Sequence, residues 1–162
     1  MEKTFYQEYN PYSLFDKALS VNYPQDKQRE LFPDAKGYGD QADAFRHMLW
    51  MATLRNKYGY YPAKGIGLFK EFVDVLSGNA TPMETGMDLN NNQVALDLFK
   101  GVTNQKELER LIKILAKQAK PVKTKKDIEK IGKSMQPMYM EEDVFYNPNM
   151  RITPDPFEDS LK

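Results

Sequence analysis

The chain has 162 residues and a formal net charge of zero at pH 7, with 41% hydrophobic and 28% charged residues, which is typical of one folded domain. Because it contains no cysteine, disulfides, thiolate catalysis and cysteine-ligated metals are excluded. The neutral overall charge, with lysines spread around helical faces and not interleaved with aromatics, argues against nucleic-acid binding.

The helical period dominates the sequence, and proline, glycine and capping residues mark its breaks. A short helix is expected to open at Asn10-Pro11. A longer helix is expected over residues 41–58, because Asp40 is a good N-cap and Gly59 is a good C-terminal stop.

A second apolar helix is expected between Pro62 and Gly78. Its interior glycines, Gly65 and Gly67, each cost up to about 1 kcal/mol relative to alanine. They indicate either the close approach of a neighbouring backbone or a helix that begins near Gly67.

A loop over residues 79–86 is expected to lead into a third helix that stops at Gly101. Two further helices are opened by capping patterns, at residues 104–107 and at residues 124–127. The first of these two has a clear apolar stripe and a charged face, as an amphipathic surface helix does.

Beyond residue 136 the helical period fades, and prolines mixed with acidic residues indicate an extended segment. No hairpin signal or long alternating run argues for a sheet. We therefore expect an all-α fold: a single compact helical domain over residues 1–136, with its motif core at residues 38–100, and an extended Pro-rich acidic C-terminal arm over residues 137–162. The arm is the candidate contact for a protein partner, or it covers the basic segment at residues 100–133.

The only histidine, His47, lies on the 41–58 helix with two charged residues at helical spacing. Asp43 precedes it by one turn and reaches both His47 and Arg46, so the three share an arc about 100° wide. A polar stripe on an otherwise apolar helix has to be buried against partners. Trp50 continues this face by one turn and is a candidate pocket wall.

Two further polar features interrupt apolar helices. Glu71 lies among aromatic and aliphatic residues, and Asp88 stands before three asparagines at the expected start of the third helix. We expect one buried polar centre that combines Asp43, Arg46, His47, Glu71, Asp88, Asn91 and Asn92. Each member also has a structural interpretation: a satisfied core histidine, an Asp88 that caps its helix, or a Glu71 that pairs with Arg46.

No cofactor is indicated, and we expect no resident metal. One histidine and no cysteine leave an oxygen-rich Mg²⁺ or Ca²⁺ site at Glu71 and Asp88 as the alternative, and no calcium-loop spacing is present. The sequence also lacks a Gly-x-Ser-x-Gly turn and a phosphate-binding Gly-x-x-x-x-Gly-Lys loop.

Three motifs together resemble a known family. The order Ala42-Asp43-Ala44-Phe45-Arg46-His47-x-x-Trp50, then an acid on a following helix, then Met87-Asp88-Leu89-x-Asn91-Asn92 resembles an uncharacterised domain of bacterial and phage-associated proteins, over residues 38–100. Members of that family often look like secreted, wall-associated or toxin-like modules.

The chain departs from the family at two motifs. The second motif of the family usually reads His-Glu, where this chain has Lys70-Glu71, and the third often reads Asp-Leu-His-Asn-Asn, where this chain has Asn90. Two of three histidines are therefore missing, which argues against a metal-dependent mechanism and leaves a one-histidine or carboxylate-based reaction.

Two functions fit this centre. The first is a hydrolase-like domain that acts on a cell-wall-like polymer or a polar ester or amide. In it His47, Glu71, Asp43 and Asp88 are catalytic, while Arg46, Asn91, Asn92 and Trp50 hold substrate or stabilise charge. The second is a non-catalytic structural or interaction protein, such as a component of a phage particle or an effector assembly, in which the same residues form a packing network.

No basic region followed by an apolar stretch occurs near Met1, and no apolar run approaches the roughly 20 residues that span a bilayer. We therefore expect neither a signal peptide nor a membrane-spanning segment. The expected location is the cytoplasm, a virion or a host cell to which the protein is delivered. No feature of the sequence indicates an oligomeric state.

Overall fold

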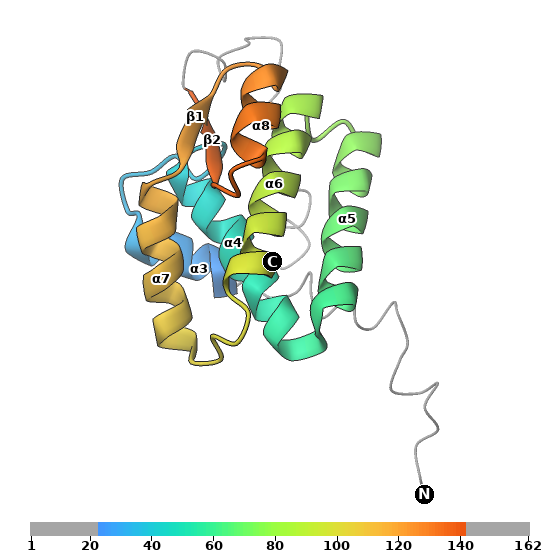
Figure 1. The fold of residues 1–162 in the computed structure, drawn as a ribbon. Coiled ribbons are helices and arrows are strands. Elements are labelled where there is room, and N and C mark those ends of the chain that lie inside the picture. The colour runs from blue at the N-terminus through green and yellow to red at the C-terminus, as the bar shows by residue number, and fades with distance from the viewer. Residues whose placement is uncertain (1–22, 142–162) are drawn as a thin grey trace, which may run out of the picture.

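Figure 1 shows the computed structural model, which describes residues 23–141. The helix expected at Asn10-Pro11 and residues 142–162 of the expected arm lie outside this range. The described elements are α3 (Tyr23–Leu31), α4 (Gln41–Tyr58), α5 (Tyr60–Leu76), α6 (Pro82–Leu98), α7 (Gln105–Lys117), β1 (Lys120–Val122), α8 (Lys125–Gly132) and β2 (Met138–Met140). The expected all-α class is confirmed, because the one sheet within residues 23–141 is a pair of three-residue strands. In the same range no helix has both the length and the apolar character needed to cross a bilayer.

Helix α4 lies at the centre of the domain, with α3, α5, α6 and α7 packed against it (Figure 1). Buried residues occur along most of its length, from Ala42 to Leu54, as expected of a helix at the centre of the core. Both predicted ends are confirmed. The Asp40 carboxylate accepts a hydrogen bond from the Asp43 N–H at 2.9 Å, and the helix ends at Tyr58, where Gly59 has a φ of 89°.

Helix α6 begins at Pro82, well before the start that the sequence analysis expects near Met87. The cause is a capping box that the sequence analysis missed. Thr81 Oγ1 accepts from the Glu84 N–H at 3.2 Å, and the Glu84 carboxylate accepts from the Thr81 N–H at 2.6 Å. Asp88 therefore lies within the helix, so its interpretation as a helix cap is wrong.

Helix α5 packs beside α4 and α6, and one of its glycines lies against a side chain of α4. A Cβ at Gly67 would lie 3.0 Å from both Cε and Sδ of Met51, whereas a Cβ at Gly65 would meet no atom within 4 Å. The close neighbour is therefore the Met51 side chain and not a backbone. Its position explains why a residue without a Cβ is favoured at Gly67, but it gives no reason for Gly65.

We expect Gly65→Ala to stabilise the domain by about 0.5–1 kcal/mol, because alanine is the better helix former and its Cβ meets open space. Gly67→Ala gains the same propensity but has to displace Met51, so this variant is expected to be the less stable of the two. Chemical denaturation measures the difference. Equal stabilisation by both substitutions would contradict the contact with Met51.

The two strands pair in parallel, with Val122 opposite Met140. Met138 and Met140 are buried and form a small second apolar cluster with Val122 and Met87. Strand β2 is therefore part of the folded domain, which corrects the expectation of an extended arm from residue 137 onward. A three-residue strand is too short to show the alternation from which strands are recognised in a sequence.

Candidate functional site

Three helices bring polar side chains together inside the domain. The group, here named the polar centre, consists of Asp43, Arg46 and His47 from α4, Glu71 from α5, and Asp88 and Asn92 from α6. All six were singled out from the sequence.

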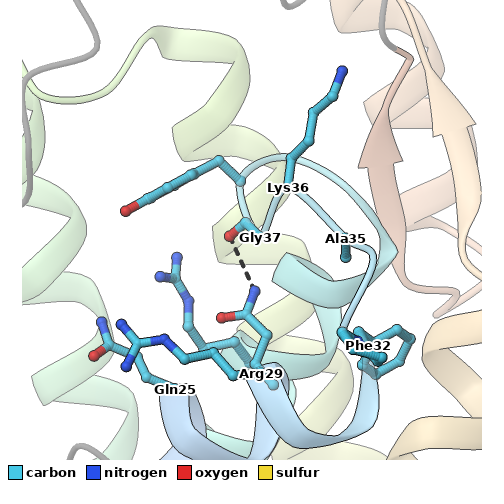
Figure 2. Close-up of a pocket in the computed structure, with 10 residues that line it drawn as sticks. Gln25, Arg29, Phe32, Ala35, Lys36 and Gly37 are labelled. Atoms are coloured by element: carbon cyan, nitrogen blue, oxygen red, sulfur yellow. Dashed lines mark hydrogen bonds between the residues drawn. The ribbon is translucent and has the colours of Figure 1, made fainter.

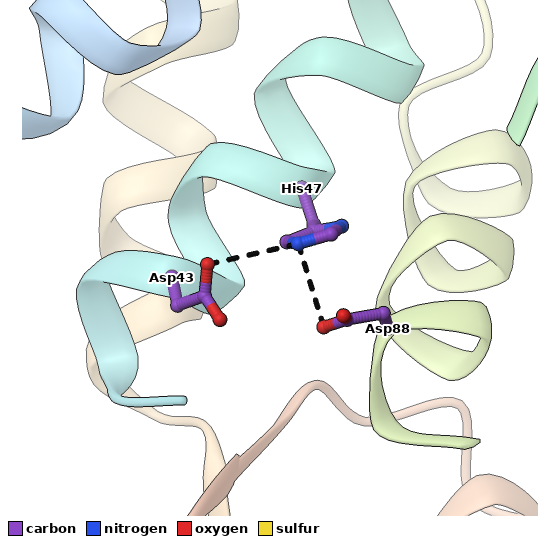
Figure 3. A group of neighbouring side chains, drawn as sticks. All are labelled: Asp43, His47 and Asp88. Atoms are coloured by element: carbon purple, nitrogen blue, oxygen red, sulfur yellow. Dashed lines mark ion pairs between the residues drawn. The ribbon is translucent and has the colours of Figure 1, made fainter. Parts of the chain in front are cut away.

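The imidazole of His47 lies among three carboxylates. Its Nε2 atom is 3.6 Å from Asp43 Oδ1 and 3.4 Å from Asp88 Oδ1, while Nδ1 is 3.9 Å from Glu71 Oε1. Figure 3 shows the ring projecting from α4 toward α6, with both aspartates facing the same ring edge. The two ring nitrogens therefore face different groups: Nε2 faces the aspartates and Nδ1 faces Glu71.

Asp43 is held in its ionised form. Arg46 donates from Nη2 to Asp43 Oδ1 at 2.5 Å, and the Gly39 N–H donates to Oδ2 at 2.7 Å. Burial opposes the charge, but Arg46, His47 and the Gly39 N–H outweigh it and hold the pKa of Asp43 below its usual value. Asp43 is therefore the carboxylate of the polar centre whose ionised form is most strongly favoured.

His47 is neutral at neutral pH. Burial is the main reason that its pKa falls to about 3; Asp43 opposes the shift, while Arg46 and Lys70 add to it. A neutral imidazole keeps one nitrogen lone pair, which is available to accept a proton or to bind a ligand.

We expect the imidazole signals of His47 to stay constant between pH 5 and pH 8 in an NMR titration, because its pKa is about 3. His47 is the one histidine of the chain, so its signals need no assignment. A histidine in contact with water would titrate near pH 6.5. A midpoint between pH 6 and pH 7 would contradict the desolvated position.

The other two carboxyl groups of the polar centre keep their protons unusually well. Burial raises the pKa of Glu71 to about 7, where Lys70 opposes the shift and Asp74 adds to it. Burial also raises the pKa of Asp88 well above its usual value, and repulsion from Asp43 and Glu71 contributes. The polar centre thus combines one ionised carboxylate with two carboxyl groups whose pKa values are raised, that of Glu71 to about 7.

Lys70 is a neighbour of the polar centre that the sequence analysis missed. Its Nζ atom is 2.6 Å from Asp74 Oδ2 and 4.0 Å from Glu71 Oε1. The lysine and Asp74 have the spacing of a helical ion pair and flank Glu71, which is the signal that could have revealed this contact.

Several buried atoms of the polar centre have no hydrogen-bond partner within residues 23–141. They are His47 Nδ1, both carboxylate oxygens of Glu71, Asp88 Oδ1, and the nitrogen and oxygen of the Asn92 amide. Buried polar groups in proteins are nearly always paired, and each unpaired one costs about 1–3 kcal/mol. The polar centre therefore has unused capacity to bind a water molecule, an ion or a polar group of a ligand.

The polar centre is almost closed to solvent. His47 is 4% exposed, Glu71 2% and Asp88 8%. The Arg46 side chain is more accessible, at 19%, and it leads from Asp43 to the protein surface.

A pocket of about 260 Å³ lies on the Arg46 side of the polar centre, against α3 and the loop that follows it (Figure 2). Arg29, Lys36 and Arg46 line it, and none of its described lining residues is acidic. One wall is fixed by Gln28, whose amide donates to the Gly37 carbonyl at 3.0 Å. This charge distribution suits the anionic part of a ligand.

Two predicted site residues have other roles. Asn91 donates its amide N–H to the Met138 carbonyl at 2.9 Å and accepts from the Met138 N–H at 2.8 Å, so it fastens β2 to α6. Trp50 is buried in the main core and lines a different pocket together with Tyr23 and Leu54. Structural roles therefore account for the burial of both residues. The Asn91 amide uses its nitrogen and its oxygen to bind Met138 and not the imidazole.

The candidate metal ligands also differ from those expected at Glu71 and Asp88. Asp43, His47 and Asp88 each offer one ligand atom, and these three atoms lie within 4.8 Å of one another. Glu71 lies behind the imidazole, on its Nδ1 side.

A family model described as "Domain of unknown function (DUF6973)" matches residues 12–123. The chain belongs to this family. No curated protein and no solved structure is significantly similar to the chain.

The DUF6973 match confirms the expectation of an uncharacterised domain family. It covers α3 to β1, beyond the expected motif core at residues 38–100, and includes every residue of the polar centre. Helix α8 and strand β2 follow the matched region, and Asn91 fastens β2 to α6 within it.

Proposed function

We propose that this DUF6973 domain is a hydrolase that activates water at the imidazole of His47 to cleave an ester, amide or glycosidic bond, with a cell-wall-like polymer as the first candidate substrate. The observation that carries the proposal is the set of buried, unpaired polar atoms around a neutral imidazole. Strongly shifted pKa values and unpaired buried groups are typical of active sites.

For an ester or amide, the residues divide into a base and an acid. His47 Nε2 takes a proton from a water molecule beside Asp88, and the water oxygen attacks the carbonyl carbon. Asp88, whose raised pKa favours its protonated form, gives its proton to the leaving oxygen or nitrogen as the bond breaks. Transfer of the imidazolium proton to Asp88 then restores the starting state, so the net change is the addition of one water molecule.

Three other residues support this chemistry. Glu71 faces Nδ1 at 3.9 Å, and on approach to hydrogen-bond distance its carboxylate would favour the tautomer that leaves Nε2 as the base. Arg46, 3.5 Å from Nε2, stabilises the negative charge that develops on the substrate oxygen. The basic pocket beside Arg46 suits a substrate with an anionic group.

The test compares His47→Gln, Glu71→Gln and Asp88→Asn with Asp97→Asn, a matched change at an exposed position of the same helix α6. Cell-wall polymer, lipid ester and peptide amide are the substrates. We expect each polar-centre variant to lose at least about 100-fold in rate, and D97N to retain full activity. Thermal unfolding checks that each variant is folded. Undiminished activity in the three variants, or no hydrolysis by the wild type, would remove the proposal.

The second candidate is the non-catalytic packing network, and burial is the observation that favours it. The side chains of His47, Glu71 and Asp88 are 2–12% exposed and do not meet a large substrate unless the domain opens. A packing network, however, is expected to satisfy its own hydrogen bonds, because its purpose is stability. The two candidates predict opposite effects of Glu71→Gln on stability.

A further inference from the structure

We propose that Asp43, His47 and Asp88 bind one divalent transition-metal ion, with Glu71 holding the ligating imidazole from its other side. This goes beyond the proposed function, because an ion can bind here whether or not the domain is a hydrolase.

The first argument is the spacing of the donor atoms. Ligands about 2.0–2.1 Å from a tetrahedral ion are about 3.3 Å from one another. His47 Nε2 is 3.6 Å from Asp43 Oδ1 and 3.4 Å from Asp88 Oδ1, close to this spacing. The three donor atoms all lie within 4.8 Å of one another, so the two carboxylates come together on a common ion by side-chain adjustment. Three protein ligands leave the fourth position open for water, as catalytic sites do.

The second argument is the group behind the imidazole. A histidine that binds a metal through one nitrogen usually donates the other N–H to a carboxylate, a carbonyl or water. Glu71 Oε1 occupies this place, 3.9 Å from Nδ1, and the glutamate is only 2% exposed. At 3.9 Å the two atoms are not hydrogen-bonded, so the carboxylate has to approach the imidazole by about 1 Å to complete a carboxylate–histidine–metal arrangement (Figure 3 shows the three proposed ligands).

The third argument concerns buried atoms without hydrogen-bond partners. Asp88 is 8% exposed, and its Oδ1, the atom nearest to His47 Nε2, has no hydrogen-bond partner among the described residues. Asn92 is 4% exposed and its amide interacts with His47 and Glu71, but neither amide atom is within hydrogen-bond geometry of a described residue. An ion with its water molecules would supply partners for such atoms, as buried water does in many proteins.

Arg46 is the cation that competes for this place. Its Nη2 atom lies 2.5 Å from Asp43 Oδ1 and 3.5 Å from His47 Nε2. The guanidinium also lies 5.7 Å from the ring centroid of Tyr38 and lines the adjoining pocket, so it can move toward the pocket when an ion takes Asp43.

The donor set selects the class of ion. One imidazole nitrogen with two carboxylate oxygens suits Zn²⁺, Co²⁺ or Mn²⁺. Ca²⁺ requires six to eight oxygen ligands, which three side chains cannot supply. We expect the affinity for Co²⁺ to exceed that for Mn²⁺, and the affinity for Zn²⁺ to be high as well.

The test is a titration of the chelator-treated full chain with Zn²⁺, Co²⁺, Mn²⁺ and Ca²⁺, each alone and without substrate. Calorimetry gives the stoichiometry, and NMR follows the imidazole nitrogens of the single histidine. We expect one ion per chain and a change at Nε2 with Zn²⁺, with no comparable binding of Ca²⁺. Absence of transition-ion binding below about 1 mM would overturn the proposal.

The variants locate the ion. Asp88→Asn and His47→Gln are expected to weaken Zn²⁺ binding by more than about 100-fold, and Glu71→Gln by about 10- to 100-fold, because it changes only the support of the imidazole. D97N is the matched control and retains wild-type affinity. Thermal unfolding without metal shows that each variant is folded. Equal affinity in D88N and the wild type would place the ion elsewhere and overturn the proposal.

These experiments test the metal site and the hydrolase activity separately. A chain that binds Zn²⁺ through Nε2 but cleaves none of the substrates supports the metal site and removes the hydrolase. A chain that binds no ion and cleaves equally well in the presence of a chelator removes the metal site and supports the hydrolase. With an ion bound, Nε2 is a ligand, and the ion takes over the activation of its own water.

Discussion

Replacement of Asn91 by alanine is expected to destabilise the domain by about 4 kcal/mol. The Asn91 amide makes two hydrogen bonds with the backbone of Met138, and all the atoms involved are buried. Alanine leaves the N–H and the carbonyl of Met138 unpaired in the interior, at about 1–3 kcal/mol each, and removes packing volume at a fully buried position. The free energy of unfolding in a denaturant titration measures this loss.

Asn90 provides the matched control for this substitution. It makes one hydrogen bond to the Gln136 carbonyl at 2.8 Å, and that contact is exposed. Water replaces an exposed bond, so Asn90→Ala is expected to cost less than about 1 kcal/mol. Equal losses of stability in N90A and N91A would contradict the role of Asn91 in fastening β2 to α6.

The ends of α4 could be predicted because they depend on local chemistry. Asp40 needs only its own backbone neighbours to cap the helix, and Gly59 needs only its own conformational freedom to end it. The convergence of His47, Glu71 and Asp88 could be anticipated for another reason. Polar side chains on apolar helices have to find each other in the interior.

The start of α6 has a local signal that the sequence analysis missed, whereas the two strands have none. Pro82 is interpreted as a loop residue unless the capping box formed by Thr81 and Glu84 is recognised. Strand β2 depends on Asn91, a residue distant in sequence, and on a partner strand that precedes α8. Such contacts have no local signature over three residues.

The orientation of α5 depends on its polar residue and not on its hydrophobicity. Glu71 is 2% exposed, whereas Phe72, the next residue, is 58% exposed and Leu76 is 70% exposed. Hydrophobicity alone would turn Phe72 inward. The helix instead presents Glu71 to His47, and the apolar residues on the other side stay outside, which indicates that the carboxyl group is retained for the polar centre.

Replacement of Glu71 by glutamine is expected to stabilise the metal-free domain by about 3 kcal/mol at pH 8 and to change its stability little at pH 4. The pKa of Glu71 is about 7 in the folded chain, against 4.5 for an ordinary glutamate, a difference mainly caused by burial. Each pKa unit corresponds to about 1.4 kcal/mol. Denaturant unfolding of both proteins across this pH range, with a chelator present, measures the effect.

The sign follows from the protons bound in each state. Between pH 4.5 and pH 7 the folded chain keeps the Glu71 proton while the unfolded chain loses it, so the wild type becomes less stable as the pH rises through this window. Glutamine carries no titrating proton and does not suffer this loss. The advantage of E71Q therefore grows through the same window and is complete above pH 7.

Glu129→Gln is the control, since Glu129 is exposed on α8 and its replacement should give the same stability difference at both pH values. The result also separates the two candidate functions. If Glu71 were an ionised member of a packing network, its loss would weaken the domain at pH 8, because a buried charge partner would be left alone. A gain in stability means that the domain keeps a carboxyl group that folding disfavours, and retention at the expense of stability is typical of a functional site. A loss at pH 8 would instead favour the packing network and count against Glu71 as part of a catalytic centre.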